Sequence, residues 1–201
     1  MKGTEFLFEA NEIFNIEYGR AIKIASGLRK AGLYPDSRTN AIQSNVTCVQ
    51  GAHIIRALAL NLNPFSHDFI FSINEYKLLF SENSHCITDL AEALSEGGVL
   101  LPSKKGINIL HHISFSLDRP RVIMSFACDP DFDAENEDYE PKIITCERVY
   151  GEGEVRSAER WSIVKKSALM FLSIVLTDSN HIGPDLNKAQ EFCSHISTLT
   201  A

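Results

Sequence analysis

The sequence contains no apolar run long enough to cross a membrane and few residues that break regular structure. In its most apolar region, the longest stretch without a charged side chain is residues 167–177, whereas a membrane-spanning helix needs about 20 residues. There are 11 glycines and 7 prolines among 201 residues, which excludes a collagen-like chain or a long flexible linker. With 44% apolar and 22% charged residues, the chain is expected to be globular and to have no contact with a membrane.

Cysteine pairs of the Cys-x-x-Cys type are also absent. The five cysteines are dispersed along the chain, and an odd number cannot all form disulfides; they are Cys48, Cys86, Cys128, Cys146 and Cys193. Glu5 and Glu9 lie where a secretory signal would have its apolar stretch. These features predict reduced thiols and a cytoplasmic location.

The chain lacks a phosphate-binding loop, the G-x-G-x-x-G fingerprint and the G-x-S-x-G nucleophile motif. Ser162 and Lys165 fit the pattern S-x-x-K, in which a lysine one helical turn away takes the proton of the serine. The motifs that accompany this pattern in enzymes are absent. The residues therefore favour a non-enzymatic protein without a cofactor, and a hydrolase or transferase would need a pocket joining Ser162, Lys165 and a histidine.

The net charge of −7 comes from one segment, because residues 1–128 and residues 141–201 are each electrically balanced. This acidic segment, residues 129–140, contains seven acidic side chains and no basic one: Asp129, Asp131, Asp133, Glu135, Glu137, Asp138 and Glu140. Because like charges repel, we expect it to be a solvent-exposed loop that binds a protein partner. It is also predicted to be dispensable for folding.

A calcium site is an alternative interpretation of the acidic segment. Asp129, Asp131, Asp133 and Glu140 fall at positions 1, 3, 5 and 12 of an EF-hand loop. Ala134 stands at position 6, where that loop has glycine for its sharp turn, and the flanking segments resemble strands rather than helices. The leading interpretation therefore assigns no metal.

A smaller basic bias lies in residues 20–38. This region has five basic side chains against one acidic one, Asp36; the basic ones are Arg20, Lys23, Arg29, Lys30 and Arg38. Arginine and lysine in a row can contact phosphates. Binding of DNA or RNA by this face is the alternative function, although the acidity of the whole chain counts against a dedicated nucleic-acid binder.

Apolar residues recur every three or four positions in the first half, which predicts helices. The predicted helices span residues 15–31, 47–62, 66–80 and 86–96. Thr47 and Gln50 have the spacing of a capping box, and Gly32 is a stop signal. Residues 5–9 are expected to form a short strand or an ordered arm, and residues 34–46 a polar loop.

Alternation of apolar and polar residues then predicts strands. They span residues 107–117, 122–128 and 142–150, with Ile109, Ile113 and Phe115 facing a helical layer that includes residues 168–176. Helices are predicted over 155–176 and from 184 onward. The expected fold class is α+β: an N-terminal four-helix region, then a three-stranded antiparallel meander packed on two C-terminal helices. The two regions, 1–98 and 99–201, can also form one continuous domain.

Three stretches resemble parts of uncharacterised phage- and prophage-encoded proteins. They are the residues Leu28–Pro35, the predicted helix over 46–62 and the strand Arg119–Met124. The resemblance covers about residues 15–125, and the glycine- and arginine-rich loop of that group is missing here. It implies a small cytoplasmic accessory protein from a mobile element and carries no catalytic residue across. The leading expectation is thus an accessory factor of phage or prophage origin that acts through a protein partner.

Overall fold

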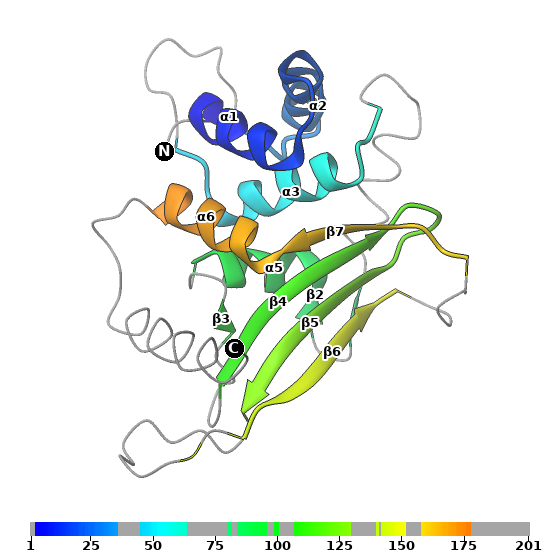
Figure 1. Cartoon of the computed structure of the whole chain (residues 1–201). Helices are drawn as coiled ribbons and strands as arrows, with labels where there is room; N and C mark the ends of the chain where they lie inside the picture. The colour runs from blue at the N-terminus through cyan, green and yellow to red at the C-terminus, as the bar shows by residue number, and fades with distance from the viewer. Residues whose placement is uncertain are drawn as a thin grey trace.

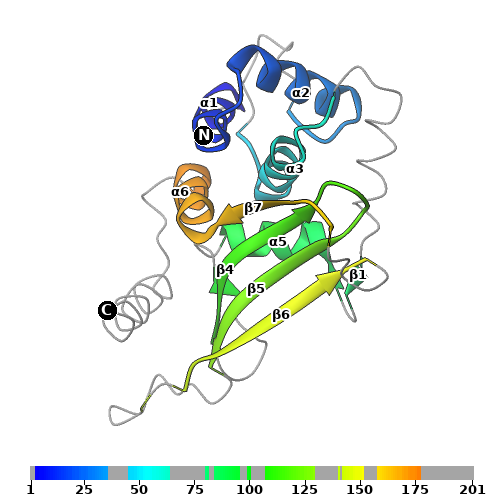
Figure 2. The ribbon, with the colours of Figure 1, turned by 45° about the vertical axis from the view of Figure 1, so that its right-hand side comes forward.

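The computed structural model describes residues 3–35, 45–63, 80–81, 84–95, 99–100, 107–129, 140, 142–151 and 158–177. Within these residues the fold is α+β, with an antiparallel sheet covered on one face by helices (Figures 1 and 2). The helices α5 and α6 contact the strands, α3 packs on α5, and α1 and α2 pack on α3. The α+β class predicted from the sequence is therefore confirmed, but among the described residues the strands pack on α5 of the first half and on α6 rather than on two C-terminal helices.

The first three helices are α1 (Gly3–Phe14), α2 (Tyr18–Lys30) and α3 (Cys48–Ala59). All three end in a Schellman arrangement, in which a residue with positive φ follows the last helical turn. That residue is Asn15 (φ 49°), Gly32 (φ 71°) or Asn61 (φ 49°), and the amide two residues after the C-cap bonds back across the turn. Gly32 therefore ends α2 as predicted, and the two asparagines perform the same function without being glycine.

The opening segment is a helix, so the predicted strand or arm over residues 5–9 is wrong. Phe6, Leu7 and Ala10 form a buried stripe at helical spacing, and α1 is held to the chain beyond α2 because the Tyr34 hydroxyl donates to the Gly3 carbonyl. The capping box is confirmed: the Gln50 amide donates to Thr47 Oγ1, and the Thr47 amide donates to Gln50 Oε1. The helix that it starts ends at Ala59, three residues before the predicted end.

Part of the predicted helical region lies outside the described residues. This applies to residues 36–44 of the predicted loop, to almost all of the predicted helix 66–80 and to the predicted helix from 184 onward. Phe80–Ser81 (β1) pairs with Ser84–His85 (β2) in a small hairpin, so position 80 is extended and not helical. The helix predicted over 86–96 is confirmed as α5 (Cys86–Ser95).

The larger sheet contains the predicted meander and two further strands. The meander is β4 (Ile107–Ser116), β5 (Val122–Asp129) and β6 (Ile144–Tyr150), joined in that order by antiparallel pairing. The strands β3 (Val99–Leu100) and β7 (Trp161–Lys165) pair with opposite ends of β4. In the described part of the chain the sheet therefore has five strands rather than the three expected.

A β-bulge changes which residues of β4 face the helices. The register with β5 shifts between Leu110 and His112, so His111 is an extra residue on β4. Because one added residue reverses the alternation, Leu110, Ile113 and Phe115 belong to the core against the helices. Ile109 lies on the opposite face of the sheet, which corrects one member of the predicted row.

The helix predicted over residues 155–176 is partly a strand. Residues 161–165 form β7, and α6 (Lys166–Thr177) begins directly afterwards. Ile163 and Val164 are β-branched, as strands favour, and they point to opposite faces of the sheet beside β4, so they are 59% and 2% exposed. Tertiary pairing therefore overrides the helical pattern up to Lys165.

One continuous core joins the helical part and the sheet. It extends from Phe6 in α1 through Ile55 in α3 and Leu90 in α5 to Ile113 in β4 and Leu172 in α6. None of the helices in the described ranges combines the length and the apolar character that crossing a bilayer requires.

Candidate functional site

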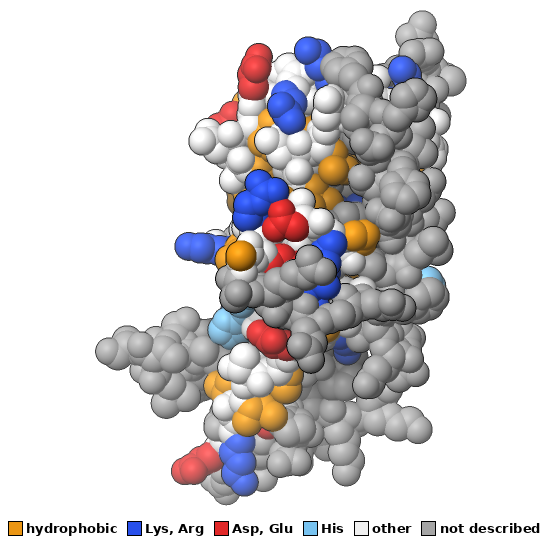
Figure 3. Space-filling view, turned by 90° about the vertical axis from the view of Figure 1, so that its right-hand side faces the viewer, with side chains coloured by type: hydrophobic (Ala, Val, Ile, Leu, Met, Phe, Trp, Pro, Cys, Tyr) orange, Lys and Arg blue, Asp and Glu red, His pale blue; other side chains and the backbone are white. Residues whose placement is uncertain are grey.

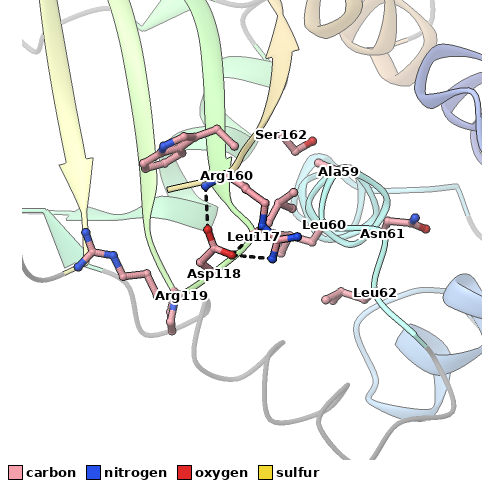
Figure 4. A pocket seen from close by; sticks show the side chains of 11 residues that line it. Ala59, Leu60, Asn61, Leu62, Leu117, Asp118, Arg119, Arg160 and Ser162 are labelled. Carbon is pink, nitrogen blue, oxygen red and sulfur yellow. Dashed lines mark hydrogen bonds and ion pairs between the residues drawn. The ribbon is translucent and has the colours of Figure 1, made fainter. Parts of the chain in front are cut away.

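A cleft of about 680 Å³ opens where the end of α3, the turn between β4 and β5, and the start of β7 meet (Figure 4). Its lining combines apolar side chains with two arginines and an aspartate, and it includes the single tryptophan of the chain. The lining residues are Ala59, Leu60, Asn61, Leu62, Leu117, Asp118, Arg119, Pro120, Arg160, Trp161 and Ser162. Segments about 60 and 40 residues apart in the sequence therefore form this site together.

One ion pair joins the turn between β4 and β5 to the residues just before β7. Arg119 donates from Nε and Nη2 to the two carboxylate oxygens of Glu159, at 2.9 and 3.1 Å, and Ser116 Oγ donates to the same carboxylate at 2.6 Å. The Glu159 side chain is 2% exposed and that of Arg119 is 22% exposed. Such a pair with two parallel bonds restricts the geometry strongly. Arg119 and Glu159 therefore shape the wall of the cleft.

A second ion pair lies at the mouth of the cleft. The backbone amide of Arg160 donates to Asp118 Oδ2 at 2.7 Å, and its Nε and Nη2 donate to Oδ1 at 2.9 and 2.6 Å. These hydrogen bonds, first from the side chain and then from the backbone, lower the pKa of Asp118 below its ordinary value. The Arg160 side chain is 73% exposed, so its guanidinium remains accessible to a ligand in solution.

The basic helix α2 reaches the rim of this cleft. Arg20 donates from Nη2 to the backbone carbonyl of Asn61 at 2.9 Å, and Asn61 lines the cleft. Lys23 and Lys30 are exposed. Lys23 is three residues after Arg20, and Lys30 is seven residues after Lys23, which places all three on one side of the helix. We call Arg20, Lys23 and Lys30 the basic stripe. Figure 3 shows basic side chains at the helical end and further down the same face, with acidic side chains between them.

The remaining basic candidates are placed differently. Arg29 donates from Nε to the Pro35 carbonyl at 3.0 Å, and its guanidinium lies 5.5 Å from the ring centre of Tyr34. This arginine therefore holds the chain that follows α2. Arg38 lies outside the described residues.

Most of the acidic segment also lies outside the described residues, namely Asp131, Asp133, Glu135, Glu137 and Asp138. Glu140 is exposed, but Asp129 is fully buried and accepts a hydrogen bond from the Lys142 amide at 3.0 Å. Asp129 thus closes the end of the β5–β6 ladder, and we remove it from the set of partner-binding residues. Of the four predicted calcium ligands, Asp131 and Asp133 lie outside the described residues.

Ser162 and Lys165 do not form the arrangement that S-x-x-K chemistry requires. Both lie on β7, where residues three apart point to opposite faces of the sheet. Ser162 pairs with Phe115 and Lys165 with His112, which are on opposite faces of β4. The helix predicted over 155–176 is a strand at these two residues, so the helical spacing that S-x-x-K chemistry needs is not present there.

A polar network between α5 and β6 has no signal in the sequence. Asp89 of α5 is 3% exposed and accepts hydrogen bonds from Arg148 Nη1 and from the Tyr150 hydroxyl. Burial and the hydrogen bond to Asp89 both raise the pKa of Tyr150, which keeps the phenol protonated. On α3, Arg56 and His53 are buried, and Arg56 Nη2 lies 3.1 Å from His53 Nδ1. Asp89, Tyr150, His53 and Arg56 are enclosed in the core and stabilise the fold, whereas the Arg148 side chain is 38% exposed.

The thiols of Cys86 and Cys128 should not react with a thiol reagent in the folded protein. Burial is the main cause that raises the pKa of each to about 12, so neither forms a thiolate at neutral pH. The reaction with a disulfide reagent measures this. The fast reaction of the accessible thiols should be the same in Cys86→Ala as in the wild type, and the variant should lack one reactive thiol only when the protein is unfolded. A smaller fast phase in this variant would contradict the prediction. The raised pKa also makes the free energy of unfolding depend on pH. It is unaffected by these thiols below the pKa of an unfolded thiol, about 8.5, and decreases at higher pH, because only the unfolded thiols then lose their protons.

The comparisons with known proteins give no match: no family model, no curated protein and no solved structure is similar to this chain. The geometry of the cleft and of the basic stripe is therefore the basis on which its function is argued.

Proposed function

We propose that this protein binds nucleic acid along a surface that runs from the basic stripe on α2 to the cleft. The observation that carries the proposal is the hydrogen bond from Arg20 to the Asn61 carbonyl, which joins the two parts. Basic groups from distant segments thereby border one concave surface. Phosphate groups bind such arrays of arginine and lysine, and each contact releases counterions.

The parts of this surface have different roles. Lys23 and Lys30 are exposed and supply positive charge along α2. Arg160 lies at the mouth of the cleft, where a phosphate has to share its guanidinium with Asp118 in an exposed ion pair, whereas the pair of Arg119 with Glu159 is more enclosed and keeps the wall in shape. Trp161 is half-buried in the lining and offers an aromatic surface beside the charged groups. A nucleotide base can stack on an aromatic side chain while its phosphate contacts a basic side chain beside it.

The local charge explains how an acidic protein can act in this way. The seven acidic side chains of the acidic segment account for the whole net charge of −7, and the rest of the chain is balanced. An interaction with phosphates depends on the local surface within about one Debye length, roughly 8–10 Å at ordinary ionic strength. The basic stripe therefore supports binding despite the overall charge. The resemblance to phage-encoded proteins suggests an accessory role in a phage or prophage.

Reversal of two charges on the basic stripe should weaken binding by at least about tenfold. The variant is Lys23→Glu with Lys30→Glu, and the matched control is Lys142→Glu with Lys165→Glu, which changes the net charge equally on the sheet. Fluorescence anisotropy with labelled single-stranded DNA, duplex DNA and RNA, repeated at several salt concentrations, measures the effect. The stripe variant should lower the slope of log affinity against log salt by about 2, since each phosphate contributes about 0.9.

Two results would contradict this proposal. The first is a wild-type protein that binds none of the three nucleic acids at low salt, and the second is an equal loss in both double variants. Because Trp161 is the single tryptophan, its fluorescence reports on the cleft alone. Binding without any change in this emission would place the nucleic acid away from the cleft.

A protein partner is the second candidate function, and one observation favours it. Ile143 and Ile144 follow the acidic segment and are 37% and 52% exposed at the start of β6. Apolar side chains next to a charged loop are typical of surfaces that bind other proteins. Binding of this kind would persist in high salt, unlike binding to phosphates.

A further inference from the structure

A second surface, on the outer side of α1 and α2, carries exposed apolar side chains that the proposed function does not use. Phe8 is 50% exposed, Ile22 43% and Tyr18 39%. The rings of Phe8 and Tyr18 meet edge to face with their centres 5.8 Å apart, so the two helices present one joined patch. Figures 1 and 2 show α1 and α2 side by side at the end of the molecule away from the sheet.

The charges around this patch differ in sign between the two helices. The exposed side of α1 and its link to α2 are acidic, with Glu5, Glu12 and Glu17 and no basic residue among the described positions before Arg20. The exposed side of α2 carries the basic stripe and no acidic residue. The patch therefore lies between an acidic helix and a basic helix.

We propose that a second copy of this chain docks on this patch in a two-fold symmetric pair. A two-fold axis brings the same surface of both copies together, so the surface must be complementary to itself. An antiparallel arrangement places the acidic α1 of one copy against the basic α2 of its partner, twice, with the apolar side chains in the centre. Burial of Phe8, Tyr18 and Ile22 supplies the hydrophobic part, and the charges determine the orientation.

The acidic side chains around Phe8 distinguish this occupant from nucleic acid, because glutamates repel phosphates. The arginine of the basic stripe that reaches the cleft lies on a different side of α2 from the patch, while Lys23 and Lys30 lie between the two. Tyr18 and Ile22 are four residues apart on the side towards α1, whereas Arg20 reaches towards the end of α3. The pairing surface is thus separate from the cleft.

Sedimentation velocity over a range of protein concentrations tests the pairing. The wild-type chain should show a concentration-dependent dimer, and Phe8→Glu should remain monomeric at concentrations where the wild type is mostly dimeric. The matched control is Phe171→Glu, which changes a phenylalanine of similar exposure, 44%, on α6 and should dimerise as the wild type does. Circular dichroism verifies that both variants are folded. A monomeric wild type, or equal dimerisation of the two variants, would overturn the proposal.

Charge reversal tests the orientation. One variant makes α1 basic, with Glu5→Lys and Glu12→Lys, and the other makes α2 acidic, with Lys23→Glu and Lys30→Glu. Each variant alone brings like charges together and should dimerise less than the wild type. A mixture of the two should recover dimers, because both contacts are again between opposite charges. If the mixture stays monomeric, the α1-to-α2 orientation is wrong. Pairing and nucleic acid both use the basic stripe, so Phe8→Glu, which stays unpaired, should bind nucleic acid at least as tightly as the wild type. This result distinguishes a failure of the pairing from a failure of the proposed function.

Discussion

Replacement of Asp89 by alanine should lower the free energy of unfolding by about 2–3 kcal/mol. The carboxylate is buried on α5 and accepts hydrogen bonds from Arg148 and Tyr150 of β6. Without it, the buried Tyr150 hydroxyl loses its carboxylate acceptor, whereas the Arg148 side chain is 38% exposed and can turn to water. A buried donor left without its acceptor costs about 1–3 kcal/mol, and the lost ion pair with Arg148 adds less because solvent screens it. Urea denaturation followed by circular dichroism measures the change.

The matched control for this prediction is Glu92→Ala on the same helix. Glu92 is exposed, so its removal should change the free energy of unfolding by about 0.5 kcal/mol or less. Tyr150→Phe removes only one of the two donors to Asp89 and should cost about 1–2 kcal/mol. If Asp89→Ala and Glu92→Ala have the same midpoint, Asp89 does not hold α5 to the sheet.

The sequence predicted those elements whose signals are local. The capping box at Thr47, the stop at Gly32 and the alternating strands depend on neighbouring residues, and the structure confirms them. The bulge at His111 has no such local signal, because His111 continues the alternate positions that hold Ile109 and Ile113. The register with β5 makes His111 the extra residue. In the same way, the segment 161–165 becomes a strand because β4 offers an edge for pairing.

The cleft could not be predicted from spacing in the sequence. Arg20 was recognised as a candidate for phosphate contact, but its link to Asn61 joins residues 41 positions apart. Arg119 lies between two predicted strands and Arg160 within the helix predicted over 155–176, and no local pattern identifies either as part of a site. Asp118 and Glu159 are their partners only after β4 and β7 have paired.

The remaining prediction concerns the face of the sheet that packs on the helices. Ile113→Asp should unfold the protein, because Ile113 is 0% exposed in the centre of β4, between Met124 of β5 and Val164 of β7. The change removes a buried side chain, worth about 2–5 kcal/mol, and adds a carboxylate without a partner, which costs several kcal/mol more. Together these losses approach the whole stability of a typical domain, about 5–15 kcal/mol.

The control for Ile113→Asp is the same substitution at a nearby isoleucine on the opposite face of the sheet. Ile163 of β7 pairs with Ser114, the next residue of β4, and is 59% exposed. Ile163→Asp should therefore keep a cooperative thermal transition, with a loss of at most about 1 kcal/mol, since the carboxylate stays in water. The contrast also distinguishes strand from helix at residues 161–165. In a strand, Val164→Asp should resemble Ile113→Asp, because Val164 is 2% exposed and pairs with Ile113 on the face that packs on the helices. If aspartate is tolerated equally at 163 and 164, the alternation of β7 is wrong.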